Sequence, residues 1–198
     1  LKKLEIERKP NTEWFHIDGS TGKGYYRDFK ENRGILTALD TTIPYQLRKE
    51  QDDAVTQTMA YSEANVNSEF LWNAKPRFGK TLSVYDFCIR KRAQNVLIVT
   101  NRPAIANSWY SDYVQFVGAE SGYIFLSEVD SIKDEKYVMT REKYLKYVGA
   151  HSATEDIKCI AFVSLQDLKG SVYFGGQYDK LRYVKDTNWD ILVIDEAH

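Results

Sequence analysis

The chain has 198 residues, of which 43% are hydrophobic and 28% are charged, and its net charge is −1. This length suits one medium domain, or one domain with a small appendage, of ordinary globular composition. A near-neutral charge excludes a strongly basic footprint over the whole chain, so any contact with nucleic acid must be local. No stretch approaches the ~20 apolar residues of a membrane span and no signal peptide opens the chain, so we expect a cytoplasmic protein without a membrane partner.

The two cysteines, Cys88 and Cys159, stand in apolar surroundings without the spacing or the neighbouring histidines of a zinc site. We expect them to be buried free thiols. The ends of the chain are also informative, because it begins at Leu1 rather than at Met and stops at His198 directly after a strand-like run. A parallel strand needs neighbours and covering helices, so we expect a fragment of a longer polypeptide.

Residues 1–40 mix charges, aromatic residues and glycines without a helical period. We expect a short hairpin or a linker from a preceding domain there. The run G-S-T-G-K-G at 19–24 has no Ser or Thr after its lysine and no apolar strand before it, so it is predicted to be a turn rather than a phosphate loop. The expected division is an N-terminal appendage over 1–40 and one larger domain over 41–198.

From residue 41 onward, helical patterns alternate with short apolar runs. Helices are predicted over about 45–65 (with Thr41 and Thr42 as caps), 80–93, 104–117 and 140–148, with a further short helix within 165–189. Strands are predicted over 70–73, 96–100, 123–126, 159–164 and 191–194. Short apolar strands that alternate with helices predict an α/β fold with a parallel sheet covered by helices on both faces.

Residues 74–81, A-K-P-R-F-G-K-T, have the form A-x-x-x-x-G-K-T between a predicted strand and a predicted helix, which is the context of a phosphate-binding loop. The loop N–H groups and the helix N-terminus offer partial positive charge, and Gly79 allows close approach of the backbone. Lys80 then reaches the β and γ phosphates, and the Thr81 hydroxyl can ligate Mg²⁺. The alternative is a basic loop that merely caps a helix.

Residues 191–198, I-L-V-I-D-E-A-H, form an apolar run that ends in two acids. At the carboxyl end of a parallel strand, Asp195 can hold Mg²⁺ through a water molecule. Glu196, the next residue, can orient and deprotonate the water that attacks a phosphate. The alternative is an exposed acidic strand end without catalytic meaning.

Together the two motifs resemble those of superfamily 2 helicases and translocases. Asp195 stands 115 residues after Lys80 (195 − 80), which fits the first RecA-like domain of that superfamily. The D-E-A-H form, the R-F-G-K-T variant and the S-L-Q-D-L run at 164–168 are most similar to motor subunits of restriction-modification systems and related bacterial DEAD/DEAH proteins. The resemblance covers about 45–198 and leaves 1–40 unexplained.

The resemblance implies a RecA-like P-loop NTPase that binds ATP and Mg²⁺. ATP hydrolysis would drive movement along, or opening of, a nucleic acid, with DNA expected rather than RNA. The implied partners are a second RecA-like domain in the same full-length chain and other subunits of a restriction system. That second domain normally supplies the arginine finger, so the 198-residue chain is expected to bind ATP weakly and to hydrolyse it poorly.

The resemblance also implies further site residues. L-R-K-E-Q at 47–51 is similar to the L-R-x-x-Q element of restriction-type motors, in which Gln51 would read the adenine; an exposed helix glutamine is the alternative. V-T-N-R-P at 99–103 matches the position of motif Ia, in which Thr100 and Arg102 would contact nucleic-acid phosphates; a helix-capping loop is the alternative. Ser164 and Gln166 lie where a third backbone-contacting segment is found.

The nucleotide-binding set predicted from the loop comprises Pro76, Arg77, Phe78, Gly79, Lys80 and Thr81. Pro76 removes one N–H donor from the loop, and Arg77 stands where helicases commonly carry glycine. We hypothesise that the Arg77 guanidinium compensates by lying near the phosphates or the nucleic acid. Two other functions stay open: an ATP-gated binding module without motor activity, and a P-loop enzyme such as a kinase, against which the D-E-A-H run argues.

Overall fold

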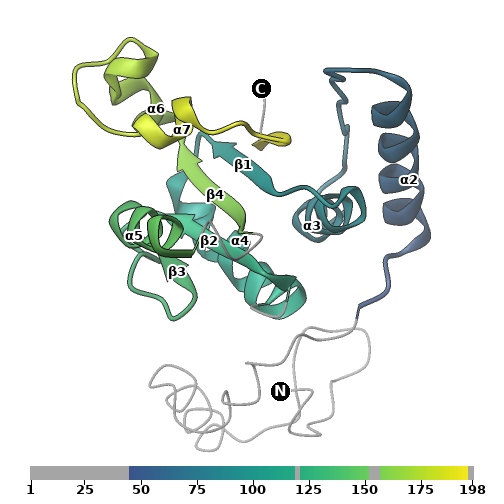
Figure 1. Cartoon of the computed structure of the whole chain (residues 1–198). Coiled ribbons are helices and arrows are strands. Elements are labelled where there is room, and N and C mark those ends of the chain that lie inside the picture. Colours follow the sequence, from purple (N-terminus) through teal and green to yellow (C-terminus); the bar gives the residue numbers. More distant parts are fainter. Residues whose placement is uncertain (1–44, 119–120, 152–156, 196–198) are drawn as a thin grey trace, which may run out of the picture. The chain divides into compact units, whose positions relative to one another are not determined.

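The computed structural model of the chain describes residues 45–118, 121–151 and 157–195 (Figure 1). These residues all fall in one of the two units into which the chain divides, Thr42–His198. The proposed appendage over 1–40, the predicted helix caps Thr41 and Thr42, the candidate base Glu196 and the terminal His198 lie outside the described residues.

Five parallel strands form the sheet, in the order β3-β2-β4-β1-β5. They are β1 Asn95–Thr100, β2 Tyr123–Ser127, β3 Val138–Met139, β4 Lys158–Ser164 and β5 Ile191–Asp195. Strands were predicted at four of these places, and only the two-residue β3 was missed. Parallel neighbours need crossover connections. Helices provide them everywhere except between β2 and β3, which residues 128–137 connect through turns.

The helices follow the predicted positions closely. They are α2 Lys49–Ala64, α3 Lys80–Lys91, α4 Ala106–Asp112, α5 Arg141–His151, α6 Leu165–Gly170 and α7 Arg182–Asp186. The helix predicted over 104–117 consists of a 3₁₀ turn (η3, Pro103–Ile105), then α4, then a wider π-helical turn (η4, Tyr113–Val117). The wide turn ends where the Gly118 N–H donates to the carbonyl of Tyr113, five residues back, at 2.7 Å.

Both faces of the sheet are covered, as predicted. Along β1, Val96 and Ile98 belong to a buried cluster that contains residues of α3 and α4, whereas Leu97 and Val99 belong to a second cluster that contains residues of α7. Successive strand residues point to opposite faces, so one apolar run supplies both clusters. Helix α2 lies against α3 and away from the sheet (Figure 1).

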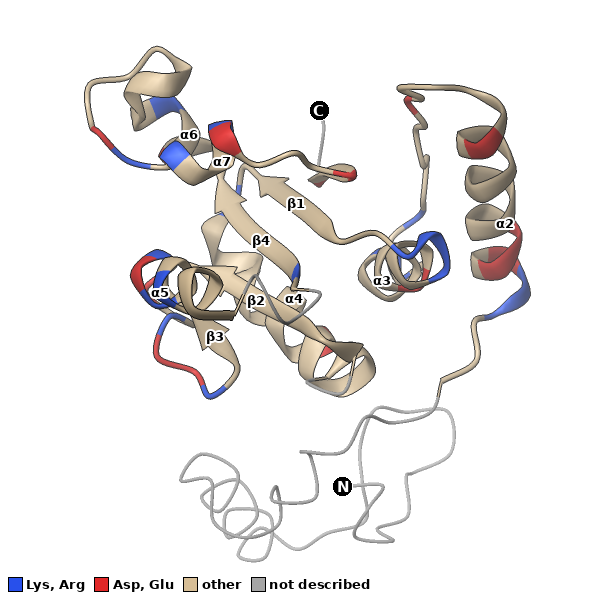
Figure 2. Cartoon of the chain, in the orientation of Figure 1, with Lys and Arg blue, Asp and Glu red and all other residues tan. Residues whose placement is uncertain are grey.

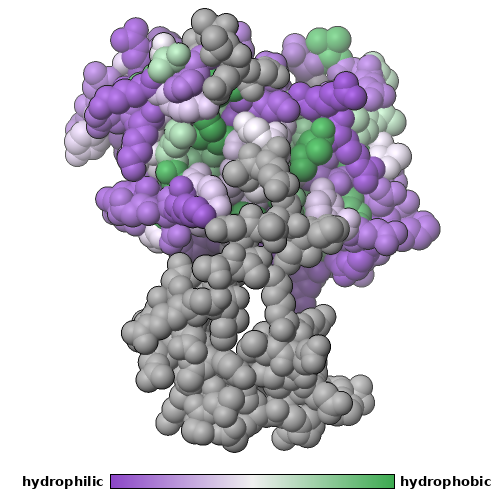
Figure 3. Space-filling model, turned by 60° about the horizontal axis from the view of Figure 1, so that its bottom comes forward, coloured by the Kyte–Doolittle hydropathy of each residue, from purple (hydrophilic) through white to green (hydrophobic). Residues whose placement is uncertain are grey.

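Charged residues of both signs are interspersed along the described part of the chain (Figure 2). On the face shown in Figure 3, hydrophobic residues form separate patches between hydrophilic ones. Among the described residues, no helix combines the length and the apolar character that crossing a bilayer requires.

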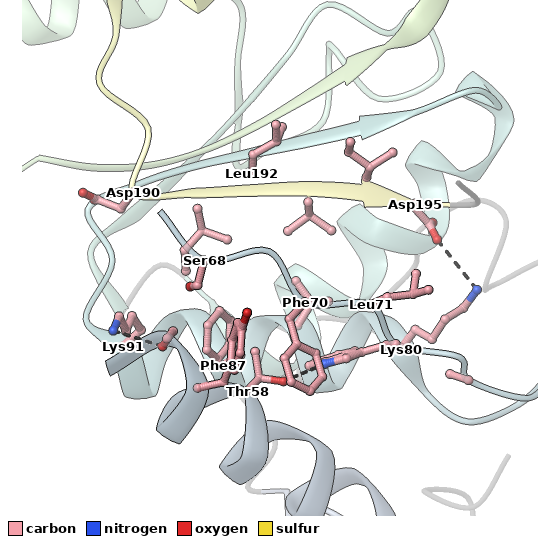
Figure 4. A pocket seen from close by; sticks show the side chains of 18 of the residues that line it. Thr58, Ser68, Phe70, Leu71, Lys80, Phe87, Lys91, Asp190, Leu192 and Asp195 are labelled. Carbon is pink, nitrogen blue, oxygen red and sulfur yellow. Dashed lines mark hydrogen bonds and ion pairs between the residues drawn. The ribbon is translucent and has the colours of Figure 1, made fainter. Parts of the chain in front are cut away.

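The strand predicted over 70–73 is wrong. These residues form no strand, although their apolar pattern is that of one. A strand needs a hydrogen-bonded neighbour, and β5 ends the sheet on this side, separated from the segment by an open pocket of about 720 Å³ (Figure 4). Leu71, which is 80% exposed, and the half-exposed Leu192 of β5 both line this pocket.

The prediction that Cys88 and Cys159 are buried free thiols is confirmed. Burial raises the pKa of each thiol to about 12. The thiolate is the reactive form, so at about pH 8 the folded chain should react with a thiol reagent such as DTNB at least about a hundredfold more slowly than in denaturant. Labelling of either cysteine in the folded chain at the rate of a free cysteine would contradict this expectation.

Candidate nucleotide site

The proposed phosphate loop begins with a tight turn over 75–78, in which the Phe78 N–H donates to the Lys75 carbonyl at 3.2 Å. Pro76 occupies the second position of this turn and Arg77 the third, with a φ of 64°. Proline followed by a positive φ is the pattern of a type II turn, whose third position favours glycine. Arg77 therefore holds a backbone conformation that costs a non-glycine residue about 1–2 kcal/mol.

Gly79 joins this turn to helix α3. It is the N-cap of the helix, with a φ of 84°, and its carbonyl accepts hydrogen bonds from both the backbone N–H and the hydroxyl of Ser83, each at 3.1 Å. Lys80 and Thr81 are consequently the first two residues of α3, as the sequence predicts. The N-terminus of a twelve-residue helix thus opens at the end of the loop.

The two motifs meet in space. The Lys80 Nζ lies 3.7 Å from Oδ1 of Asp195, the last residue of β5 (Figure 4). The Asp195 side chain is 13% exposed and that of Lys80 is 44% exposed, so the cation stands on the solvent side of the carboxylate. The other carboxylate oxygen, Oδ2, accepts a hydrogen bond from Trp109 Nε1 at 3.1 Å. A cation and a carboxylate thus line one position beside the helix start.

Gln51 lies against the loop rather than on an exposed helix face, and it is only 4% exposed. Its Nε2 donates to the Phe78 carbonyl at 2.8 Å, and its Oε1 accepts from the backbone N–H of Arg48 at 2.8 Å. An adenine at Gln51 would compete with these bonds, and its recognition there stays a prediction. Arg48 was missed from the sequence: its guanidinium donates to the carbonyls of Arg77, at 3.2 Å, and of Phe78.

The predicted nucleic-acid residues lie at the carboxyl ends of the neighbouring strands. Thr100 is in register with Ser164 on one side and with Asp195 on the other. The Thr100 and Ser164 hydroxyls are buried, and each accepts a local N–H, from Arg102 at 3.1 Å and from Asp167 at 3.1 Å. The structure therefore brings Thr100 beside Asp195 and Ser164 one strand further, and both hydroxyls support the local backbone.

The other two residues of this set are exposed. Gln166 donates from Nε2 to the Asn101 carbonyl at 3.0 Å, which ties the segment after β4 to the segment after β1. Arg102 lies between β1 and the turn that leads into α4. Of the predicted set, only Arg102 and Gln166 present exposed side chains at this edge of the sheet.

Residues 44–198 match the protein family described as type III restriction enzyme, res subunit (ResIII). The chain belongs to the ResIII family. The ResIII domain is helicase-like, and the five-stranded parallel sheet agrees with its RecA-like fold. The predicted resemblance to superfamily 2 domains of restriction systems is thereby confirmed.

A relative in Mycoplasma pneumoniae carries a name that describes the C-terminal part of a candidate type II restriction enzyme and methyltransferase. It is 30% identical to the ResIII chain over 177 residues, which are 86% of this chain and 22% of the relative. The chain therefore spans about a fifth of the length of this relative. No solved structure matches the chain.

The oxygen-bearing side chains that the two motifs supply, Thr81 at the start of α3 and Asp195 at the end of β5, fit a magnesium ion that arrives with a nucleotide. The Thr81 hydroxyl and the Asp195 carboxylate are oxygen ligands, which Mg²⁺ prefers, and in ATPases one or two protein oxygens share the ion with substrate phosphates. Within 45–118, 121–151 and 157–195, no group of three or more His, Cys, Asp or Glu side chains could hold a metal alone. The donor set suits an ion shared with phosphates rather than a self-contained metal centre.

Replacing Gly79 by alanine should destabilise the fold and the loop together. The positive φ disfavours any side chain, and a Cβ at this position would meet Nε2 of Gln51 and disturb its bond to Phe78. We expect a loss of about 1–3 kcal/mol in the free energy of unfolding, measured by denaturant titration. The control is Gly149→Ala in α5, where an added Cβ meets nothing within 4 Å and helix propensity favours alanine. Equal stability of the two variants would contradict the assigned loop geometry.

Proposed function

We propose that this ResIII chain is the ATP-binding half of a DNA-dependent ATPase, a helicase or translocase motor of a restriction-type enzyme. The observation that carries the proposal is the approach of Lys80 to Asp195, at 3.7 Å, beside the N-terminus of α3. Phosphoryl transfer depends on positioning and on neutralisation of charge rather than on covalent chemistry by the protein. A lysine, a helix start and a strand-end carboxylate at one point are the groups that this chemistry needs.

Each residue has one role in the proposed reaction. The loop over 76–81 holds the phosphates with its N–H groups, and Lys80 balances the charge of the β and γ phosphates. Thr81 and Asp195 would hold Mg²⁺, which supplies further neutralisation of phosphate charge when bound. Glu196, the next residue in the chain, would orient the attacking water and accept its proton.

The proposal includes an opposite wall of the site, formed by a second RecA-like domain of the same polypeptide. An arginine finger from such a domain would raise the rate by about 10³–10⁵. The 198-residue chain alone should therefore bind ATP weakly and hydrolyse it slowly. In the same proposal, residues 1–40 connect to an upstream part of the protein, and the motor works in the cytoplasm.

The proposed path of the DNA backbone runs over the carboxyl ends of β1 and β4. Arg102 and Gln166 would contact phosphates with their side chains, while the Thr100 and Ser164 hydroxyls would support the backbone of these two segments. Other subunits of a restriction system would supply recognition of the DNA sequence. In the sheet order, β1 is the neighbour of β5 and β4 lies one strand further from Asp195.

The test is the DNA dependence of ATP hydrolysis by the full-length polypeptide that contains this chain. Duplex DNA should increase turnover, and a double change, Arg102→Ala with Gln166→Ala, should raise the DNA concentration needed for half-maximal stimulation about tenfold or more. The same duplex should have no effect on a Lys80→Ala protein. Turnover that is robust but indifferent to any nucleic acid would sink the proposal of a DNA motor.

The unusual Arg77 gives a separate prediction. If its guanidinium contacts the phosphates, Arg77→Ala should weaken ATP binding about 10- to 100-fold, because a hydrogen bond to a charged group contributes about 1.5–3 kcal/mol. Arg77→Gly should weaken binding as well, although it relieves the strained turn, and the pair thus separates charge from backbone strain. ATP affinity and turnover that are both unchanged in Arg77→Ala would refute the role of the side chain.

A further inference from the structure

A buried tryptophan contacts the carboxylate of the proposed nucleotide site. Trp109 of α4 is 2% exposed, and its indole Nε1 donates to Oδ2 of Asp195 at 3.1 Å. The other oxygen of the same carboxylate, Oδ1, lies 3.7 Å from the Lys80 Nζ. The two oxygens of Asp195 thus have different partners, one inside the fold and one on the open side.

The indole is held from several directions. The Tyr85 ring of α3 meets it edge-on at 5.5 Å, and the Phe162 ring of β4 lies at 6.4 Å. The Tyr85 hydroxyl also donates to the Trp109 carbonyl at 2.8 Å, in a buried hydrogen bond. Tyr85 belongs to the helix that begins with Lys80, so the indole is fixed against the same helix that presents the lysine.

The direction of the hydrogen bond from the Trp109 indole to Asp195 matters for the chemistry. An indole N–H can donate a hydrogen bond but cannot accept one. It therefore favours an ionised carboxylate as its partner and cannot bind a competing hydrogen-bond donor. A carboxylate with one oxygen fixed in this way keeps its second oxygen in one direction. Phenylalanine would fill much of the same space between Tyr85 and Phe162, but it would leave Oδ2 without its donor.

We propose that Trp109 is a positioning residue for Asp195: it holds Oδ2 inward so that Oδ1 faces Lys80 and the Mg²⁺ that accompanies ATP. This inference rests on the proposed function, since it assumes that Oδ1 of Asp195 faces the Mg²⁺ of a bound nucleotide. Removing a residue that orients a metal ligand through a hydrogen bond, without touching the metal itself, commonly lowers metal affinity by about 10- to 100-fold.

The first test compares ATP binding by the 198-residue chain and its Trp109→Phe variant, with Mg²⁺ and with EDTA. We expect the variant to lose about tenfold in affinity with Mg²⁺ and nothing with EDTA, because only the orientation of the metal-facing oxygen has changed. The matched control is Trp189→Phe, which removes an indole that donates to the Val184 carbonyl at 2.8 Å. An equal response to Mg²⁺ in Trp109→Phe and in the unmodified chain would overturn the proposal.

A second test uses the indole N–H resonances of the four tryptophans in the folded, ¹⁵N-labelled chain. Asp195→Asn should shift the Trp109 signal and leave the Trp189 signal in place, and Mg²⁺ with ATP should do the same in the unmodified chain. An unshifted Trp109 signal in Asp195→Asn would overturn the proposal even where Trp109→Phe does not fold.

Different results would contradict the proposed function and the role of Trp109. ATP binding that is the same in the unmodified chain and in Lys80→Ala would remove the proposed function. ATP binding that depends on Lys80, together with a Trp109→Phe variant that keeps its full response to Mg²⁺, would remove only the role of Trp109.

Discussion

Replacing Lys80 by alanine should lower the affinity of the 198-residue chain for Mg²⁺-ATP by about 10- to 100-fold, since bonds between a charged donor and phosphate contribute about 1.5–3 kcal/mol. The Lys80 ammonium lies 3.7 Å from the Asp195 carboxylate, and Lys80 is the first residue of α3, whose N-terminus would face the phosphates. Isothermal titration calorimetry measures the loss directly. The fold should remain, because a half-exposed ion pair contributes little to stability.

The matched control for this prediction is Lys91→Ala. Lys91 ends the same helix, about 16 Å from Lys80 at the usual helical rise, and donates to the Ser62 hydroxyl at 3.1 Å. It carries the same charge, so a general electrostatic effect would reduce ATP affinity in both variants. An unchanged affinity in Lys80→Ala would contradict the assignment of the loop.

Glu196→Gln should reduce ATP turnover of the full-length polypeptide by about a hundredfold or more while ATP binding persists. Glutamine keeps the size of the side chain but cannot accept the proton of the attacking water, and general base catalysis contributes about 10²–10⁴-fold. Steady-state turnover and calorimetric ATP binding, measured on the same preparation, separate the two effects. Glu142→Gln on the exposed face of α5 is the control, because its carboxylate forms an exposed ion pair with Lys146.

The same variant separates the proposed motor from an ATP-gated binding module. A motor loses translocation or unwinding along with turnover, whereas a binding module keeps its ATP-dependent partner interaction in Glu196→Gln. Full turnover in this variant would remove Glu196 as the base.

Much of the fold could be predicted because β1, β2 and β4 are buried on both faces and therefore read as short apolar runs. Strand β1 is the clearest case, since Val96 to Val99 alternate between the two buried clusters. The run over 70–73 has the same composition but no paired neighbour, and hydrogen-bonded pairing is not encoded in one segment. The two residues of β3 are too few to carry a pattern.

The candidate site divides in the same way. The places of Lys80 and Thr81 at a helix start and of Asp195 at a strand end could be predicted, because the two motifs have fixed spacing relative to those elements. Their roles in binding ATP and Mg²⁺ stay predictions. The contacts of Arg48 and Gln51 with the loop depend on how α2 lies against α3, and no spacing reveals that. Trp109 likewise reads as one of several aromatic residues on an apolar helix face, and only the fold brings it to Asp195.

The strain at Arg77 also became interpretable only in three dimensions. In the sequence, Pro76 and Arg77 are departures from a glycine-rich loop. In the structure they form the second and third positions of a tight turn, in which proline presets the first dihedral and the arginine accepts a positive φ. The loop is thus shaped by this turn and by the donors of α2, rather than by additional glycines.

The most direct test of the proposed nucleotide site is a crystal structure of the chain with Mg²⁺ and a non-hydrolysable ATP analogue. We expect the β and γ phosphates against the loop over 76–81, the Lys80 ammonium on those phosphates, and the metal between Thr81 and Asp195. A nucleotide bound elsewhere on the chain, with the loop free of phosphate, would contradict it.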